Sequence, residues 1–204
     1  MLAPAQMYPD AFGRSSDVAN SASESYNRER KGEATMILGM STETFTLVHV
    51  VISLIGIASG LIVLFGMLGS HRMPGWTALF LLTTILTSVT GFLFPFTTLL
   101  PSHIVGIISL VVLAIALLAL YGFGLRGAWR WIYVVTAVVA LYLNSFVAVF
   151  QAFLKIPFVH DLAPTQAEPP FMIAQLVVLA LFVVLGLTAV VKFRPPTAAE
   201  AVPA

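Results

Sequence analysis

The segment WIYVVTAVVALYLNSFVAVFQAFL, from Trp131 to Leu154, contains 24 residues and no charged side chain. An α-helix rises about 1.5 Å per residue, so this segment covers about 36 Å, and the hydrocarbon core of a bilayer is about 30 Å thick. A charged side chain at the centre of a membrane helix costs roughly 2.5–3.5 kcal/mol, so the lack of charge favours a membrane span. The segment therefore predicts a transmembrane helix.

Four further apolar runs of similar length surround this segment. They extend from Phe45 to Leu68, from Trp76 to Leu100, from His103 to Leu125 and from Phe171 to Phe193. No carboxylate occurs between Glu43 and Asp161, and 59% of the 204 residues are hydrophobic whereas 9% are charged. This composition does not fit a soluble domain. We expect an all-α integral membrane helical bundle with about five transmembrane helices over residues 44–194.

The two ends of the chain differ from this apolar region. Residues 1–43 are polar and too poor in apolar side chains to bury a core, so they predict a disordered extension. They also lack the apolar stretch and cleavage site of a signal peptide. Met36 and Met40 stand directly before the first run, so an over-extended start is an open alternative. Residues 195–204 predict a short cytoplasmic tail.

Basic residues occupy the connections on one side of the predicted bundle. With five spans, that side carries Arg72, Arg126, Arg130, Lys192 and Arg194, together with Trp76, Trp129 and Trp131. Cytoplasmic connections are enriched in Lys and Arg, and indole rings favour the membrane interface. We therefore expect the C-terminus in the cytoplasm and the N-terminus outside.

Several classes of function are disfavoured by what the sequence lacks. The formal net charge of +1 gives no reason to expect a nucleic-acid partner, and the absence of cysteine removes disulfides and thiolate metal sites. No predicted span contains Asp or Glu, which ion-coupled carriers place inside the membrane. Phosphate-binding loops and the H-E-x-x-H and G-x-S-x-G motifs are also missing. These absences favour a protein without enzymatic activity or a bound metal.

Two predicted helices carry small and hydroxyl-bearing residues along one face. The first run has His49, Ser53, Gly56 and Gly60, and the second has Thr84, Ser88, Gly91 and Pro95. Small residues let membrane helices approach closely, so Ser53, Gly56 and Gly60 predict a helix contact. The second face predicts packing in a helix kinked at Pro95, because hydroxyls can bond the carbonyls that a proline frees. A polar cavity on that face is the alternative.

Asn144 lies near the middle of the fourth predicted span. An amide in hydrocarbon costs several kcal/mol when it is unpaired, so this side chain should face other helices. The hydroxyl face of the second run is the expected partner. We interpret Asn144 as a bond between helices, with a role in lining a ligand pocket as the alternative.

Further polar side chains gather at the predicted extracytoplasmic ends of the helices. They are His49, His103, Gln151 and Gln175, with His160, Asp161 and Glu168 in the loop above. Ionisable groups near a membrane interior are candidates for function. The candidate ligand-binding site therefore consists of His49, His103, Asn144, Gln151 and Gln175.

Two histidines at similar depth on different helices suggest a second hypothesis. His49 and His103 could ligate one b-type haem, because two imidazoles can bind an iron from opposite sides. The protein would then be a membrane redox subunit.

Four stretches of the sequence carry a resemblance. GWTALFLLTT (Gly75–Thr84), TGFLFPF (Thr90–Phe96), GAWRWIYVVTAVVALYLN (Gly127–Asn144) and APTQAEPPF (Ala163–Phe171) resemble small multi-pass proteins of unknown function from bacterial inner membranes. The resemblance covers about residues 44 to 194. It implies an inner-membrane location and brings no activity to any residue.

Together these observations lead to one working hypothesis. We expect a non-enzymatic inner-membrane protein that is either an accessory subunit or a binder of a small apolar or lipid-like molecule at the outer end of the bundle. Its partners would be the bilayer and either such a ligand or another membrane protein. A purely structural scaffold is a third hypothesis.

Overall fold

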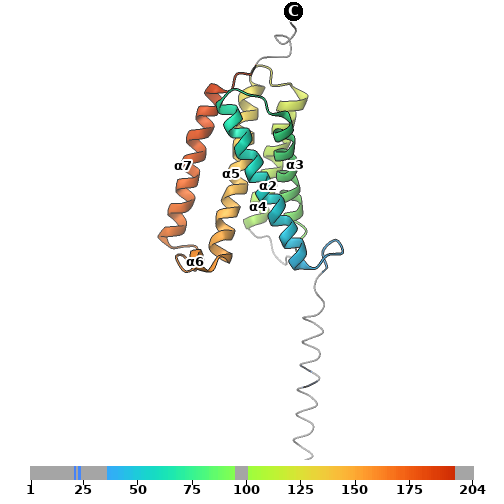
Figure 1. Cartoon of the computed structure of the whole chain (residues 1–204), viewed down its shortest axis with the longest axis vertical. Helices are drawn as coiled ribbons and strands as arrows, with labels where there is room; N and C mark the ends of the chain where they lie inside the picture. The colour runs from blue at the N-terminus through green and yellow to red at the C-terminus, as the bar shows by residue number, and fades with distance from the viewer. Residues whose placement is uncertain (1–20, 22, 24–35, 95–100, 196–204) are drawn as a thin grey trace, which may run out of the picture. The chain divides into compact units, whose positions relative to one another are not determined.

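The computed structural model describes residues 21, 23, 36–94 and 101–195, and its regular structure is helical (Figure 1). The helices are α2 (Thr42–Leu68), α3 (Pro74–Gly91), α4 (Pro101–Leu117), α5 (Trp129–Lys155), α6 (Pro157–His160) and α7 (Pro169–Lys192), and a π-helical turn, η1 (Leu118–Gly122), continues α4. In this described part no β-strand occurs. The chain is therefore an all-α helical bundle, as the sequence predicts.

The chain divides at Phe45 into two compact units, and the packing described below belongs to the second, which begins at Thr46. The predicted disordered extension, residues 1–43, lies outside the described residues except for residues 21, 23 and 36–43. Of the predicted tail, only residue 195 lies within them.

Four helices are long and apolar enough to cross a membrane. They are Thr42–Leu68, His103–Gly122, Trp129–Lys155 and Pro169–Lys192. Each coincides within a few residues with a predicted span. The chain therefore has the helices of a membrane protein, and the second predicted span is the one that departs from expectation.

The second predicted span, from Trp76 to Leu100, is too long. Helix α3 ends at Gly91, and the N–H groups of Phe92 and Leu93 close its last turn by bonding the carbonyls of Val89 and Thr90. Proline has no N–H to offer the carbonyl four residues before it, and it disfavours the helical conformation in the residue just before it. We therefore expect a helix that approaches Pro95 to end before it, and the predicted kink falls on this proline. Pro95 itself lies outside the described residues.

Helix α3 has an unusual distribution of polarity. Its buried residues include Thr77, Thr83 and Thr84, whereas its exposed large side chains are apolar. The exposed set, Leu79, Leu82, Leu86 and Val89, continues as Leu93 just beyond the helix, in steps of three and four. Residues so spaced share one helical face. A helix with an apolar outside and hydroxyls inside is the reverse of a water-soluble amphipathic helix.

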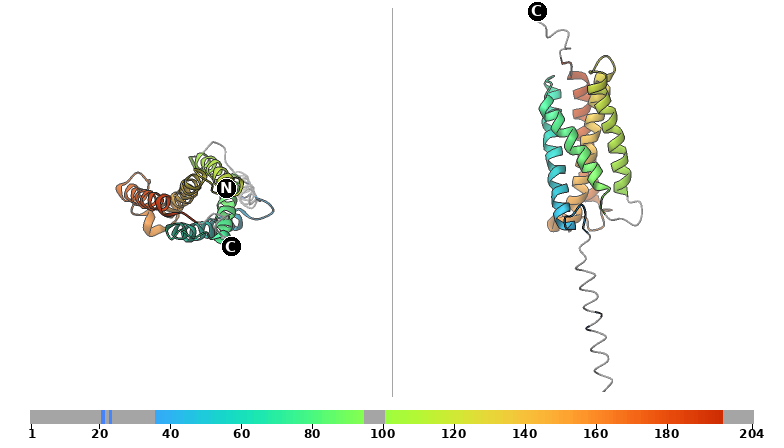
Figure 2. Two further views of the ribbon diagram at one scale, coloured as in Figure 1. Left: turned by 90° about the horizontal axis from the view of Figure 1, so that it is seen from above. Right: turned by 90° about the vertical axis from the view of Figure 1, so that its right-hand side faces the viewer.

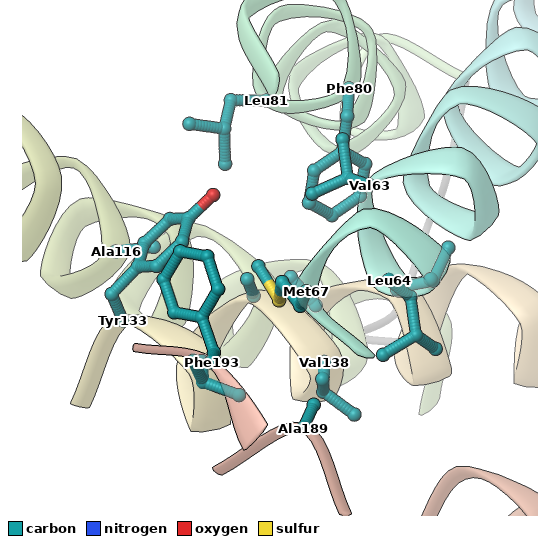
Figure 3. Packing of buried hydrophobic residues seen from close by; sticks show 14 of the residues in the cluster. Val63, Leu64, Met67, Phe80, Leu81, Ala116, Tyr133, Val138, Ala189 and Phe193 are labelled. Carbon is teal, nitrogen blue, oxygen red and sulfur yellow. The ribbon is translucent and has the colours of Figure 1, made fainter. Parts of the chain in front are cut away.

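Helix α5 is the central element of the packing. It lies against α3, α4 and α7, and Figure 2 shows these helices running side by side. Eight of its 27 residues are buried, among them Tyr133, Ala137 and Leu141. Figure 3 shows the core around them, where the ring of Tyr133 lies beside that of Phe193 at a centroid distance of 6.2 Å.

Gly60 allows α2 to approach both α3 and α5. A Cβ atom built at this position would lie 2.6 Å from Leu141 Cδ1 and 2.8 Å from two ring carbons of Phe80. Real Cβ atoms do not approach other atoms so closely, so only glycine fits without a shift. Gly60 therefore sets the distance between α2 and the aromatic ring of Phe80.

We predict that Gly60→Ala lowers the free energy of unfolding in mild detergent by about 1–3 kcal/mol, because the new methyl group overpacks the core. Thermal unfolding followed by circular dichroism measures the loss. Gly91→Ala is the matched control, because its Cβ would meet only His49 Cε1 at 3.9 Å. Equal stability of the two variants would contradict the close contact at Gly60.

Candidate functional site: the polar interior around α3

The hydroxyl groups of α3 bond first to their own helix. Thr83 Oγ1 donates to the carbonyl of Leu79 at 2.7 Å, and Ser88 Oγ donates to that of Thr84 at 3.0 Å. Thr87 and Thr90 do the same. Each of these hydroxyl hydrogens is donated within the helix, so none of them needs a water molecule as its partner. Each hydroxyl oxygen can still accept a bond from a neighbouring helix.

Asn144 on α5 is the deepest amide, and it pairs with α2. Ser53 Oγ donates to Asn144 Oδ1 at 2.8 Å, and Asn144 Nδ2 donates to the Ser53 carbonyl at 3.4 Å. The amide is 7% exposed. The bonded partner is thus the serine of α2 and not the hydroxyl face of the second run, which the sequence suggested.

Gly56 is the point where three helices meet beside this pair. A Cβ atom there would lie 3.1 Å from Asn144 Nδ2 and 3.2 Å from both Thr83 Oγ1 and Thr84 Oγ1. Polar atoms from α3 and α5 therefore converge on the bare backbone of α2. Thr84 Oγ1 is buried and has no hydrogen-bond partner, so it is an unsatisfied polar atom of the interior.

Closer to the C-terminal end of α3, its hydroxyls contact α4 and α2. Ser88 Oγ lies 3.2 Å from Ser109 Oγ on α4, and Thr90 Oγ1 lies 2.8 Å from His49 Nδ1 on α2. Thr90 Oγ1 also donates to the Leu86 carbonyl at 2.6 Å. The ring of Phe94 lies edge-on to this imidazole at 5.3 Å.

The two histidines of the haem hypothesis have different surroundings. His49 contacts Thr90 and Phe94, whereas His103 is buried on α4 beside Phe92, with ring centroids 5.7 Å apart. The described part of the chain contains no cluster of three or more His, Cys, Asp or Glu side chains able to hold a metal ion.

The hydroxyls of α3, the Ser53–Asn144 pair, Ser109 and His49 are called the polar seam. The two candidate glutamines lie apart from it. Gln151 is exposed near the end of α5. Gln175 Nε2 donates to the Phe146 carbonyl at 3.2 Å, and its Oε1 is buried without a partner. The five candidate residues therefore enter separate contacts: His49 and Asn144 lie along the seam, while His103, Gln151 and Gln175 do not join it.

An apolar crevice lies between α2, α3 and α5. It has about 160 Å³ of empty space but is too narrow for a water molecule. Gly60, Met67, Phe80 and Leu141 are among its lining residues, and none of these is polar. The crevice therefore offers contact to hydrocarbon only.

Two residues of this interior were missed in the sequence. Ser109 was overlooked because it is a single serine in an apolar run, and only its partner Ser88 gives it meaning. Thr77 shares a side-chain hydrogen bond with Tyr133 of α5, and its signal was its place seven residues before Thr84 on the same helical face.

The loop before α7 is organised by Glu168. Its carboxylate accepts bonds from the Thr165 hydroxyl at 2.8 Å and from the N–H groups of Thr165 and Ala167. Desolvation acts to raise the pKa of Glu168, but these hydrogen bonds outweigh it and lower the pKa below its usual value. The carboxylate is therefore a loop anchor.

We predict that the Ser53–Asn144 contact is a bond between helices. In a double-mutant cycle of Ser53→Ala and Asn144→Leu, the coupling energy should be about 0.6–1.7 kcal/mol, as for other hydrogen bonds between membrane helices. Chemical unfolding in detergent measures it. The control is Ser53→Ala combined with Gln151→Leu, because Gln151 is exposed on the same helix; a coupling as large in this pair would refute the assignment.

Comparison of the chain with protein-family models, with curated proteins and with solved structures gives no match. What the chain does is therefore inferred from its own residues and geometry.

Proposed function

We propose that this chain is a non-enzymatic multi-pass protein of the bacterial inner membrane and acts as an accessory subunit of another integral membrane protein. The proposal is supported by the way in which polar groups inside the bundle bond one helix to another. Ser53, Asn144 and Ser88 bond to neighbouring helices. The apolar crevice between Gly60 and Leu141 is narrower than a water molecule. An interior of this kind holds helices together and leaves the outer surface to make functional contacts.

The proposal includes five membrane spans, with α3 as the fifth. Its 18 residues measure about 27 Å, close to the thickness of the hydrocarbon core. Its average composition is too polar to mark it as a span, but its hydroxyls point inward and its outer stripe is apolar. With five spans the basic connections share one side, which supports a cytoplasmic C-terminus.

Helix α7 is the proposed docking surface. Only Phe182 and Ala189 are buried among its 24 residues. Gly186 lies against Val138 of α5, so α7 has a close neighbour on one side. The rest of its surface is lined by large apolar side chains, including Leu176, Val184 and Leu187. Either lipid or a helix of a partner protein can cover this face. We propose that a partner helix covers it.

The alternative within the same hypothesis is a small apolar or lipid-like ligand, and the crevice at Gly60 is the observation that favours it. Its apolar lining suits an alkyl chain. The space is too narrow in its present form, so Met67 or Phe80 would have to move before a ligand could enter. Met67 is flexible enough for such a change.

We predict that native mass spectrometry of the tagged chain, released directly from its own membranes, detects a stoichiometric complex with one other integral membrane protein. Val184→Trp should reduce that complex at least tenfold, because the indole disrupts a close helix contact on α7. Leu54→Trp on α2 is the matched control, since Leu54 and Val184 are exposed to similar extents, 56% and 61%.

Three outcomes of this measurement count against the proposal. A chain that carries only bulk lipid contradicts an accessory role, and equal loss of the complex in both variants removes the assignment to α7. A fixed mass increment from one apolar molecule favours the ligand-binding alternative. An absorption spectrum of the same sample tests the haem hypothesis, which requires a Soret band that is lost in His49→Ala.

A further inference from the structure

Three segments of the chain meet at one end of the bundle. They are residues 69–73 between α2 and α3, residues 123–128 between η1 and α5, and residues 193–195 after α7 (Figure 1). The backbone N–H of Arg194 donates to Ser70 Oγ at 2.8 Å, and Arg130 Nη1 donates to the carbonyl of Phe193 at 2.9 Å. The first bond joins residues 193–195 to the segment before α3, and the second joins them to the first turn of α5.

In its described residues, this end carries cations and no carboxylate. Arg72, Arg126, Lys192 and Arg194 are all exposed, and Asp and Glu are absent from the three segments and from the first turns of α3 and α5. None of the four cations has an ion-pair partner among residues 36–94 and 101–195. The opposite end differs, because the connection that follows Lys155 contains Asp161 and Glu168.

Indole rings accompany the cations at this end. Trp76 follows Arg72 by four residues, and Trp129 follows Arg126 by three, so each arginine precedes a helix whose first turn holds a tryptophan. Trp76 is 44% exposed and Trp131 is 48% exposed, whereas Trp129 stacks on Phe123 at 3.8 Å. Exposed indoles beside cations are typical of the level of lipid headgroups.

The backbone at this end adds to the positive potential. Both α3 and α5 begin here, and neither has a side-chain cap on its first N–H groups. The N-terminus of a helix carries a partial positive charge. At Gly75, in the first turn of α3, a Cβ atom would meet nothing within 4 Å, so the approach to this helix end is open.

We propose that this basic end binds the phosphate group of an anionic phospholipid from the adjacent leaflet, with Arg72 and Arg126 as the main contacts. The guanidinium group forms paired hydrogen bonds with phosphate oxygens, which suits a phosphodiester. The indoles of Trp76 and Trp131 lie beside the glycerol and upper acyl region of the same lipid. This site is independent of the proposed partner on α7.

The test measures the thermal unfolding midpoint of the full chain, delipidated in a neutral detergent, during titration with dioctanoyl phosphatidylglycerol. We expect the midpoint to rise with this anionic lipid and to stay constant with dioctanoyl phosphatidylcholine. Arg72→Gln and Arg126→Gln should each weaken the apparent affinity for the lipid roughly fivefold, because each variant loses the attraction of one surface cation to the anionic headgroup. Raising the salt concentration should weaken binding further, because the cations are exposed.

Lys155→Gln is the matched control, because it removes one exposed cation from the opposite end and should leave the affinity unchanged. Arg72→Lys keeps the charge but loses the paired hydrogen bonds, so its affinity should lie between those of the natural chain and Arg72→Gln, which separates loss of charge from a failure to fold. An equal response to phosphatidylcholine, or an equal loss in Lys155→Gln, would overturn the proposal. So would inorganic phosphate that raises the midpoint as much as the lipid does, because the site would then recognise a free ion.

Discussion

The reversed polarity of α3 is the constraint on which the rest of the bundle depends. Its hydroxyls point inward while Leu79, Leu82 and Leu86 point outward. In hydrocarbon no solvent can pair with a buried hydroxyl or amide, so each such group has to find a partner inside the protein. Four of the hydroxyls of α3 bond to carbonyls of their own helix, and two of these four also contact Ser109 and His49 on neighbouring helices. Thr84 Oγ1 is the exception among the buried hydroxyls of this helix, because it has no partner. The helix is therefore stable only where α2, α4 and α5 surround its polar face and apolar material surrounds the other.

Several features of the structure follow from this arrangement. Glycines on α2 bring that helix close enough for Ser53 to reach Asn144, and Gly56 receives the polar atoms of three side chains. The apolar crevice at Gly60 is too narrow for a water molecule. On the outer surface the described residues present two distinct features, the apolar face of α7 and the basic end that holds Arg72 and Arg126.

The sequence was sufficient for most of the helices, because long uncharged runs have only one stable form in a bilayer. It was also sufficient for the burial of Asn144 between helices. The end of α3 was missed because Leu93 and Phe94 continue the apolar pattern up to Pro95, and apolarity says nothing about where the backbone turns. The partner of Asn144 was also missed. Helical periodicity shows which residues share a face, but only the packing shows that this face meets Ser53. Gln151 is a candidate because of its level along the predicted span. Its exposure depends on the direction in which the end of α5 faces, and the sequence does not show that direction.

The most direct test of the central claim uses the fact that the natural chain has no cysteine. In the variant Ser88→Cys/Ser109→Cys, oxidation in native membranes should form a disulfide between α3 and α4, because the two hydroxyl oxygens lie 3.2 Å apart. Protection of both thiols from a maleimide-linked polymer, reversed by reduction, reports the bond. The pair Val89→Cys/Ser109→Cys should stay reactive, since Val89 belongs to the outer apolar stripe. A disulfide in the second pair and none in the first would show that α3 faces the other way and would contradict the account.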